Sequence, residues 1–504
     1  MDKNLIIKNT IVLYIRAFFS LIISLYTTRI ILNNLGIENF GIYQVVGGIV
    51  LLFSFLNISL SNATERYISY YIGLGEEKNL NKLFGMTINI HLFISIIILL
   101  LIEIFGTWYI KYSANLGEIQ ISDVYLVLHM SALGLVFNII SVPYRAFLIS
   151  KEKITSFAYI DLLSVFLKLI VAMLLILFSE NRLVVYAFLL MMSSVFVAFI
   201  YKIICNKKIP ESSYVLNWDK KMFKEILFFT GWTTVPAIAS IMKGQGTILL
   251  LNSFFGPVLN ASQGIANQVK AGIKTFSLNL LAAFTPQITI TYAEKDYETM
   301  KKLVLSGNKI TFLIFLTLCI PVIIERDFIL SMWLVVVPDY TSIVVLLVLL
   351  DTIVSLMSST FNIAIRATGK IKNYEISVNS IHIIGFPLSF ILLKTGFNFD
   401  SVFLLWIFLS FIALFFECYW LNRVLPFISL KEILLSNILV MLISGLFIFC
   451  ISYVVFINLE QSFIRLILVI ITSSISLVLC SYFFAFNEIE KKMISKYLNK
   501  IFRF

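Results

Sequence analysis

Residues 260–286 read NASQGIANQVKAGIKTFSLNLLAAFTP, a mostly apolar stretch that is long enough to cross a bilayer yet carries two lysines near its middle. Its polar residues recur at spacings of three and four, which places them on one face of an α-helix. They are Asn260, Gln263, Asn267, Lys270, Lys274 and Ser277. Because a charge at membrane depth costs about 2.5–3.5 kcal/mol, we expect this face to line a positively charged cavity that receives an anion.

The composition predicts a polytopic helical membrane protein. Of the 504 residues, 60% are hydrophobic and 13% are charged, which is too little charge to cover a soluble domain of this length. Apolar runs of about 18–25 residues recur along the chain, whereas the strands of a transmembrane barrel would read as ten-residue alternating segments. A net charge of +11 would suggest nucleic acid in a soluble protein, but here we expect no nucleic-acid partner.

We predict an all-α fold with about fourteen transmembrane helices, each long enough to span the hydrocarbon core. The predicted spans are 10–32, 41–62, 83–105, 123–149, 154–178, 183–204, 224–251, 258–288, 303–324, 341–364, 374–393, 401–421, 433–457 and 462–486.

The distribution of Lys and Arg predicts the orientation. Of the 39 basic residues, 28 fall on the side of the N-terminus and five lie at membrane depth. The opposite side holds Arg29, Lys111, Arg182, Arg326, Lys394 and Arg465. The positive-inside rule therefore places both termini in the cytoplasm, and the basic, amphipathic tail 487–504 is expected to lie on the anionic inner leaflet.

An internal repeat predicts how the spans are grouped. Residues 30–87 align with residues 250–307 at a constant offset, which places Gly36 on Gly256 and Lys82 on Lys302. Each copy holds an even number of spans, so the two copies are parallel repeats. We predict two six-helix lobes joined by a cytoplasmic linker and followed by a helix pair and a tail. The boundaries are 1–204, 205–223, 224–421, 422–486 and 487–504.

The basic residues at membrane depth are the candidate substrate-binding site. Four of them have no acidic partner within one helical turn, which favours a functional cavity; these are Arg16, Lys243, Lys270 and Lys274. The candidate polar lining of that cavity is Ser20, Ser24, Gln263 and Asn267. For hydroxyl groups alone, the simpler interpretation is that they ease helix–helix packing, which is common in membranes.

Three further residues have alternative interpretations. Asp161 and Lys168 lie two turns apart on nearly the same face of span 154–178, so they form either a structural pair or a ligand site. Asp351 either neutralises Lys243 or Lys274 or serves as a protonation or Na⁺ site that couples transport to an ion. The three histidines form no metal-spaced cluster, and we find no ATP-binding or catalytic motif, so we expect no metal, cofactor or enzymatic site.

Two motifs carry a family resemblance. The stretch NNLGIENFGIYQVVGG at 33–48 and PYRAFLISKEK at 143–153 resemble the bacterial polysaccharide flippases of the O-antigen type. These proteins belong to the multidrug/oligosaccharidyl-lipid/polysaccharide exporter superfamily. The predicted arrangement of six, six and two spans is similar to theirs over the whole chain.

The resemblance implies a substrate, a mechanism and partners. The substrate would be an oligosaccharide linked to undecaprenyl diphosphate, moved from the cytoplasmic to the periplasmic leaflet of the bacterial inner membrane by alternating access of the two lobes. The last two spans would help to guide the lipid tail. A polysaccharide polymerase and chain-length machinery would be partners. Lys and Arg in a cavity suit a diphosphate, and polar stripes suit sugar hydroxyls.

Three alternatives remain open at the level of sequence. A cation-coupled multidrug exporter of the same fold would be expected to carry acids in the N-terminal cavity, where this chain has Arg16. A flippase of the lipid-linked peptidoglycan precursor also has a basic cavity. An integral-membrane polysaccharide polymerase or ligase would need a large outer loop, and the longest outer loops here are short, near 106–122 and 325–340.

Overall fold

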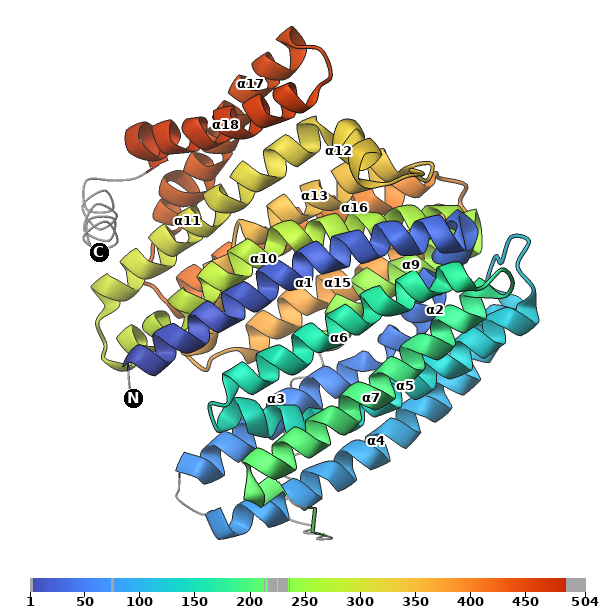
Figure 1. The fold of residues 1–504 in the computed structure, drawn as a ribbon. Coiled ribbons are helices and arrows are strands. Elements are labelled where there is room, and N and C mark those ends of the chain that lie inside the picture. The colour runs from blue at the N-terminus through green and yellow to red at the C-terminus, as the bar shows by residue number, and fades with distance from the viewer. Residues whose placement is uncertain are drawn as a thin grey trace. The chain divides into compact units, whose positions relative to one another are not determined.

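The computed structural model describes residues 3–73, 77–212, 214, 215, 224, 234 and 236–485, and most of them are helical (Figure 1). Eleven of these helices are long and apolar enough to cross a membrane, or twelve if the bent pair α2–α3 forms one span. The chain is therefore an all-α multi-pass membrane protein, as the composition predicts.

The helices of the first part of the chain precede residue 213. They are α1 (Lys3–Leu35), α2 (Ile37–Leu52), α3 (Ser54–Gly73), α4 (Glu77–Tyr112), α5 (Ile121–Ser150), α6 (Ile154–Leu174), α7 (Arg182–Lys208) and the short 3₁₀ turns Leu175–Leu177 and Pro210–Ser212.

The helices of the second part follow residue 235. They are the π-helical turn Met242–Gly246, α9 (Thr247–Phe255), α10 (Pro257–Ala293), α11 (Tyr297–Ile324), α12 (Arg326–Trp333), α13 (Thr341–Leu356), α14 (Ser359–Ala367), α15 (Lys372–Lys394), α16 (Phe399–Val424), the π-helical turn Glu432–Ile438, α17 (Leu439–Asn458), α18 (Phe463–Cys480) and the π-helical turn Ser481–Ala485.

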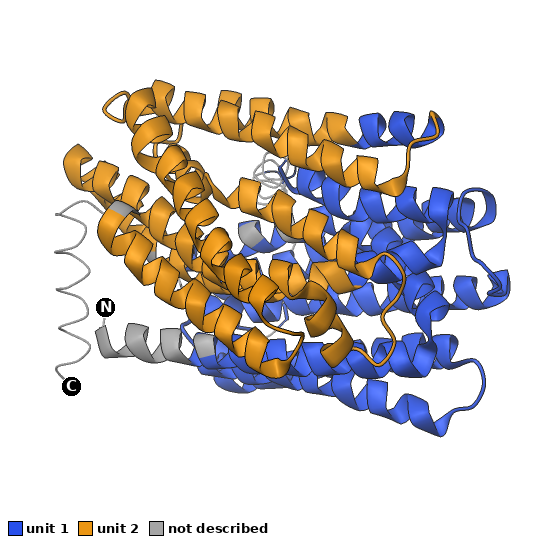
Figure 2. Cartoon of the chain, turned by 90° about the horizontal axis from the view of Figure 1, so that it is seen from above, with its two compact units in different colours: residues 1–264, 386–394 blue, residues 265–385, 395–504 orange. Residues whose placement is uncertain are grey.

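The chain divides into two compact units (Figure 2). Unit 1 comprises residues 1–264 and 386–394, and unit 2 comprises residues 265–385 and 395–504. In unit 1, α5 packs against α2, α3, α4 and α7, while α1 packs against α6. In unit 2, α11 packs against α13, α14, α17 and α18, and 72% of the residues in its apolar 18-residue segment are buried.

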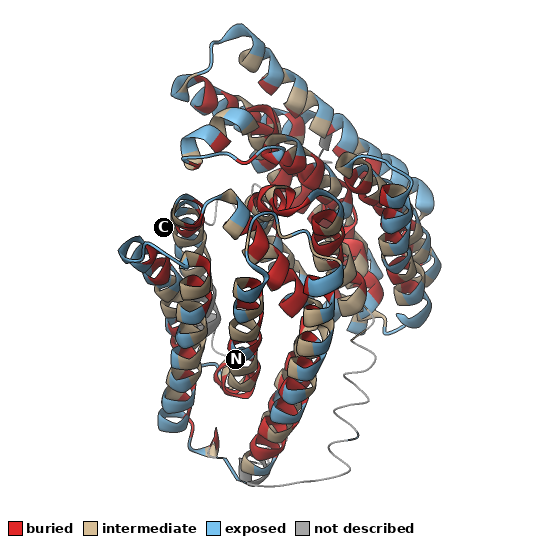
Figure 3. Cartoon of the chain, turned by 90° about the vertical axis from the view of Figure 1, so that its right-hand side faces the viewer, coloured by how far each residue is buried: buried red, intermediate tan, exposed pale blue. Residues whose placement is uncertain are grey.

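Large apolar side chains cover much of the protein surface. Ile104 is 69% exposed, Ile464 is 69% exposed and Phe415 is 68% exposed. In Figure 3, exposed residues alternate with buried ones along single helices. A soluble protein rarely shows such extensive apolar exposure, whereas a helix in lipid does so on its outward face.

Two predicted spans are interrupted. Span 41–62 is two helices that meet at Phe53 with a bend of 50°. There the Ser54 hydroxyl donates a hydrogen bond to the Leu51 carbonyl at 2.7 Å, so this side chain competes with the backbone N–H groups for that acceptor. Span 341–364 breaks at Ser358, whose φ is −123°, where the Met357 carbonyl accepts a hydrogen bond from the Asn308 side chain at 2.6 Å.

Some predicted segments lie partly or wholly outside the described residues. Span 224–251 is described continuously from residue 236 onward, where it is helical. The predicted linker 205–223 is described through Ser212 and at residues 214 and 215, and the predicted tail 487–504 lies outside the described residues.

Candidate functional site

Helix α10 carries the predicted polar stripe. It runs without interruption from Pro257 to Ala293, so the spacing of three and four does place the six polar residues on one helical face. Asn260, Gln263 and Ser277 are buried, with exposures of 0%, 4% and 0%. Asn267, Lys270 and Lys274 are half-buried. This face therefore packs inside the protein, as expected for a chain that keeps its intramembrane charges away from lipid.

The start of α10 is fixed by local backbone chemistry. Gly256 adopts φ 79° and ψ −172°, a conformation open to glycine and strained for other residues. Pro257 follows at the first helical position, where its missing N–H removes no intrahelical hydrogen bond. The sequence Gly-Pro thus turns the chain and begins the polar helix at one defined residue.

Glycines allow α10 to approach α2 closely within unit 1. A Cβ atom added to Gly41 would lie 2.0 Å from the Pro257 carbonyl oxygen. A Cβ atom added to Gly264 would lie 2.8 Å from the Gln44 side chain. Gln44 therefore lies directly against the polar helix, at the level of the first turns of the stripe.

Several polar atoms on this face are buried without a hydrogen-bond partner among the described residues. They are the Asn260 Oδ1, Gln263 Oε1 and Ser277 Oγ atoms, while the Asn260 Nδ2 donates to the Ile248 carbonyl at 2.7 Å. A buried polar group without a partner costs about 1–3 kcal/mol, so such atoms mark positions where a ligand's hydroxyl groups could bind.

Lys243 lies on an irregular helical turn. The π-helical segment Met242–Gly246 contains it, and the Thr247 hydroxyl donates back to the Lys243 carbonyl at 2.7 Å. Lys243 itself is half-buried. A π-bulge inserts an extra residue into a helix and is frequent at functional sites. The sequence pattern of Thr and Ser around Lys243 gave no signal for this bulge.

Arg16 is ion-paired in the structure. Its Nη1 lies 3.3 Å from Asp161 Oδ2, with side-chain exposures of 26% and 39%. Its guanidinium carbon lies 5.2 Å from the centre of the Phe157 ring. The sequence left open whether Asp161 and Lys168 bridge each other or pair with residues of other helices; the structure pairs Asp161 with Arg16 on α1, and Lys168 is exposed.

The remaining candidates lie on α1 and α13. Ser20 Oγ is buried without a hydrogen-bond partner among the described residues, and the Ser24 carbonyl accepts the Thr28 hydroxyl at 3.0 Å. Asp351 Oδ1 accepts the Ser410 hydroxyl at 2.7 Å. Of the four predicted substrate-binding residues, Arg16 and Lys243 belong to unit 1, and Lys270 and Lys274 belong to unit 2.

Sequence reasoning missed two buried polar clusters in unit 2. The Glu417 carboxylate on α16 accepts hydrogen bonds from the Ser358 hydroxyl and from the Tyr374 hydroxyl, the latter at 3.2 Å. Glu325 binds Arg465 through two hydrogen bonds of 2.6 and 2.7 Å. These partners lie between 43 and 140 residues apart in the chain, so no local spacing could reveal them.

Comparisons with known proteins identify the fold. Residues 15–174 match the family model described as MatE. Over 281 residues the chain is 20% identical to the uncharacterized membrane protein EpsK of Bacillus subtilis (strain 168), a match that spans 55% of each chain and thus about half the length of that relative.

Two solved structures have similar folds. One is the lipid II flippase MurJ in an inward closed conformation, with a TM-score of 0.66, 13% identity and coverage of 94% of this chain and 98% of that one. The other is an inward-facing multidrug resistance MATE family transporter of the MOP superfamily, with a TM-score of 0.66, 14% identity and coverage of 82% and 99%.

Proposed function

We propose that this chain is a transporter of the MOP superfamily rather than an enzyme, and that it is a flippase for lipid-linked oligosaccharide. Its substrate is an oligosaccharide joined to undecaprenyl diphosphate. The chain carries it from the cytoplasmic to the periplasmic leaflet of the bacterial inner membrane, by alternating access through a cationic cavity.

The observation that carries this proposal is the composition of one helical face. Along α10, half-buried Lys270 and Lys274 lie between the buried amides of Asn260 and Gln263 and the buried hydroxyl of Ser277. Lysine ammonium groups in a low-dielectric site attract a diphosphate strongly. Amide oxygens that lack partners among the described residues suit sugar hydroxyls, which donate hydrogen bonds. One ligand that needs both chemistries is a glycan on a lipid diphosphate.

The finer architecture follows from the same proposal. The proposal counts α10 and the predicted span 224–251 as two further spans beside the twelve that include the bent pair α2–α3, which makes fourteen, and it arranges them as two parallel six-helix lobes and a helix pair. The excess of basic residues in the loops on one side supports a cytoplasmic location of both termini. A polysaccharide polymerase would receive the flipped unit on the periplasmic side.

A lipid II-type precursor flippase is the nearest second candidate. The fold match to a structure described as a lipid II flippase covers 94% of this chain. That substrate class shares the lipid diphosphate and differs in its glycan. A multidrug exporter is a third candidate, in which a cationic substrate would compete with Arg16 for the half-exposed Asp161 carboxylate.

The test measures flipping in proteoliposomes. Fluorescent undecaprenyl-diphosphate oligosaccharide is incorporated with purified protein, and its transfer between leaflets is followed by quenching. Neutralising both stripe lysines, Lys270→Ala with Lys274→Ala, removes two charge-assisted contacts, so we expect the flipping rate to fall at least about tenfold. Lys302→Ala removes the same charge from an exposed position on α11 and should leave the rate unchanged.

The same vesicles separate the candidates. Flipping of the double variant at the rate of the unaltered protein would contradict the proposal. A lipid-diphosphate disaccharide-peptide that is flipped faster than the oligosaccharide would favour the peptidoglycan precursor. Uptake of a cationic dye that is lost in Asp161→Asn, with no flipping of either lipid, would favour the multidrug exporter.

A further inference from the structure

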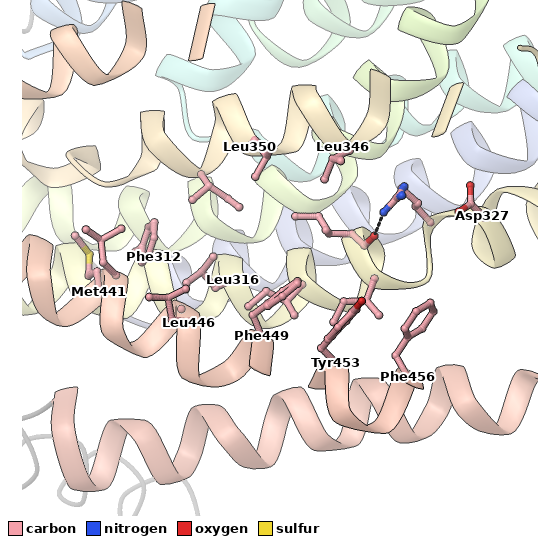
Figure 4. A pocket seen from close by; sticks show the side chains of 17 residues that line it. Phe312, Leu316, Asp327, Leu346, Leu350, Met441, Leu446, Phe449, Tyr453 and Phe456 are labelled. Carbon is pink, nitrogen blue, oxygen red and sulfur yellow. Dashed lines mark hydrogen bonds between the residues drawn. The ribbon is translucent and has the colours of Figure 1, made fainter. Parts of the chain in front are cut away.

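An apolar groove lies within unit 2, apart from the polar stripe of α10. It has a volume of about 550 Å³ and lies among α11, α12, α13 and α17 (Figure 4). Its walls include Phe312, Leu316, Leu350, Phe449 and Phe456. An apolar space of this size that is left unfilled loses dispersion contacts along its whole lining, and water gains no hydrogen bonds there. In a bilayer, the available apolar filler is a lipid chain.

The dimensions of the groove match one bilayer leaflet. Its lining on α11 runs from Phe312 to Ile324, and twelve residues of α-helix rise by about 18 Å. The hydrocarbon core of a bilayer is about 30 Å thick, so one leaflet contributes about 15 Å. The groove thus accommodates one acyl chain along its length.

Two opposite charges lie at one end of the groove. Arg326 and Asp327 both line it, at the start of α12. The Arg326 Nε donates to the Ser342 hydroxyl at 2.9 Å and its Nη1 donates to the Ile323 carbonyl at 2.9 Å, which fixes the plane of the guanidinium. Among the described residues, neither the Arg326 Nη2 nor the Asp327 carboxylate has a hydrogen-bond or ion-pair partner.

We propose that this groove is a binding site for a zwitterionic phospholipid with a primary ammonium headgroup, of the phosphatidylethanolamine class. The acyl chain fills the apolar groove, the phosphate accepts hydrogen bonds from Arg326, and the ammonium group binds Asp327. An anionic lipid would meet the Asp327 carboxylate and be disfavoured. A choline headgroup has no N–H with which to reach that carboxylate.

The bound lipid also has a structural consequence. The groove separates α17 from α11 and α13 along part of their length, and residues of all three helices line it. A lipid in the groove therefore completes the packing of α17 onto the centre of unit 2. Its removal should loosen the C-terminal helix pair, whichever substrate the transporter carries.

The test measures retained lipid and thermal stability. The full-length protein is purified in detergent, its co-purified lipids are identified by native mass spectrometry, and the delipidated protein is titrated with dioleoyl-phosphatidylethanolamine, -phosphatidylglycerol and -phosphatidylcholine. We expect retained phosphatidylethanolamine and the largest rise in melting temperature with that lipid. Asp327→Asn should reduce the preference for phosphatidylethanolamine over phosphatidylglycerol about tenfold, because one charge-assisted contact is lost.

Matched variants keep the outcome interpretable. Arg326→Gln should weaken binding of all three lipids, and Leu350→Trp should reduce lipid retention by filling the groove. Glu460→Gln removes a carboxylate from the exposed α17–α18 connection and should change nothing.

Three outcomes would overturn the proposal. The first is a protein that retains no phospholipid, and the second is equal stabilisation by the three lipids. The third is displacement of the bound phospholipid by undecaprenyl diphosphate at equimolar concentration, which would assign the groove to a substrate tail. The flipping assay with Lys270→Ala and Lys274→Ala is read separately, so failure of the transport proposal leaves this result intact.

Discussion

Gly36 and Gly256 adopt the same backbone conformation, with φ 80° and ψ 168° at the first and φ 79° and ψ −172° at the second. Each joins the end of one helix to the start of the next, Gly36 between α1 and α2 and Gly256 between α9 and α10. The repeat alignment places these two glycines on each other, so their shared geometry supports the predicted internal repeat. Such a conformation is essentially restricted to glycine.

Substitution of either glycine tests this constraint. Gly36→Ala and Gly256→Ala should each lower the free energy of unfolding by about 1–3 kcal/mol. Gly256→Ala should be the more damaging, because its new Cβ lies 3.2 Å from the Asn115 side chain, whereas nothing lies within 4 Å at Gly36. Thermal unfolding in detergent measures both. Gly47→Ala, within helix α2 and also with open space around the added Cβ, is the control and should not destabilise.

Asn252 joins two segments that the sequence assigns to different lobes. Its Oδ1 accepts the Asn115 backbone N–H at 3.1 Å and its Nδ2 donates to the Asn115 carbonyl at 3.0 Å. The Tyr109 hydroxyl donates to the neighbouring Leu249 carbonyl at 2.7 Å. If alternating access separates the two predicted lobes at the Asn115–Asn252 contact, these hydrogen bonds must break in each transport cycle. A disulfide between Asn115→Cys and Asn252→Cys, in a background without the five native cysteines, should therefore abolish flipping until it is reduced.

A second cysteine pair provides the control for this experiment. The hydroxyls of Ser69 on α3 and Ser150 on α5 are 3.0 Å apart, and both residues lie within the predicted N-terminal lobe. A disulfide between Ser69→Cys and Ser150→Cys should form without stopping transport. Normal flipping by the crosslinked 115–252 protein would show that this contact does not open.

The sequence predicted where helices form, but it did not predict which side chains contact one another between helices. The spacing within residues 260–286 predicted a helix with one polar face, and α10 confirms this because the helical period is a local property of the chain. The break at Ser358 depends on Asn308, a residue about 50 positions earlier whose side chain takes the Met357 carbonyl. Asp161 was close to Lys168 in sequence but pairs with Arg16, because the packing of α1 against α6 sets that contact.

The Arg16–Asp161 ion pair predicts an effect on ligand affinity. A lipid diphosphate that binds Arg16 must compete with the Asp161 carboxylate, whose Oδ2 atom lies 3.3 Å from Arg16 Nη1. Because a half-exposed pair contributes about 0–1 kcal/mol, Asp161→Asn should raise affinity for lipid diphosphate about two- to fivefold, and Arg16→Ala should lower it. Equilibrium binding of a fluorescent lipid diphosphate measures both. Combined with Asp161→Asn, Arg16→Ala should remove the gained affinity for lipid diphosphate. If Lys168→Ala removes that gain and Arg16→Ala does not, then Lys168 rather than Arg16 is the cation that Asp161 neutralises.

The Lys151–Glu211 pair predicts a pH dependence of stability outside the membrane. A hydrogen bond to its own backbone N–H and one from Lys151 Nζ at 3.1 Å hold the pKa of Glu211 below its ordinary value. A depressed folded-state pKa stabilises the protein above the unfolded pKa, about 4.3, and this contribution is lost as the pH falls through the lower folded pKa. Lys151→Met should therefore reduce the melting temperature at pH 7 more than at pH 3. Lys153→Met, at an exposed neighbouring position, should give equal shifts at both pH values.

The Glu325–Arg465 pair holds the start of α18 against the end of α11. Glu325 is fully buried and Arg465 is 9% exposed, and the guanidinium carbon also lies 4.4 Å from the centre of the Phe456 ring. Removing one partner leaves a buried charge without compensation, so Glu325→Gln and Arg465→Met should each cost about 3–5 kcal/mol of unfolding free energy. The double variant leaves no buried charge and should be more stable than the sum of the single losses predicts.

A more exposed ion pair calibrates that measurement. The Arg366 Nη2 atom lies 2.9 Å from Glu375 Oε1, but the Arg366 side chain is 55% exposed. Arg366→Met should cost less than about 1 kcal/mol, because water and salt screen an exposed pair. Unfolding of all four variants in one detergent, followed by intrinsic fluorescence, gives the comparison. Equal losses of unfolding free energy for Arg366→Met and Arg465→Met would mean that burial does not set the strength of the Glu325–Arg465 pair. If the loss in the Glu325→Gln, Arg465→Met double variant equals the sum of the two single losses, the two residues are not coupled.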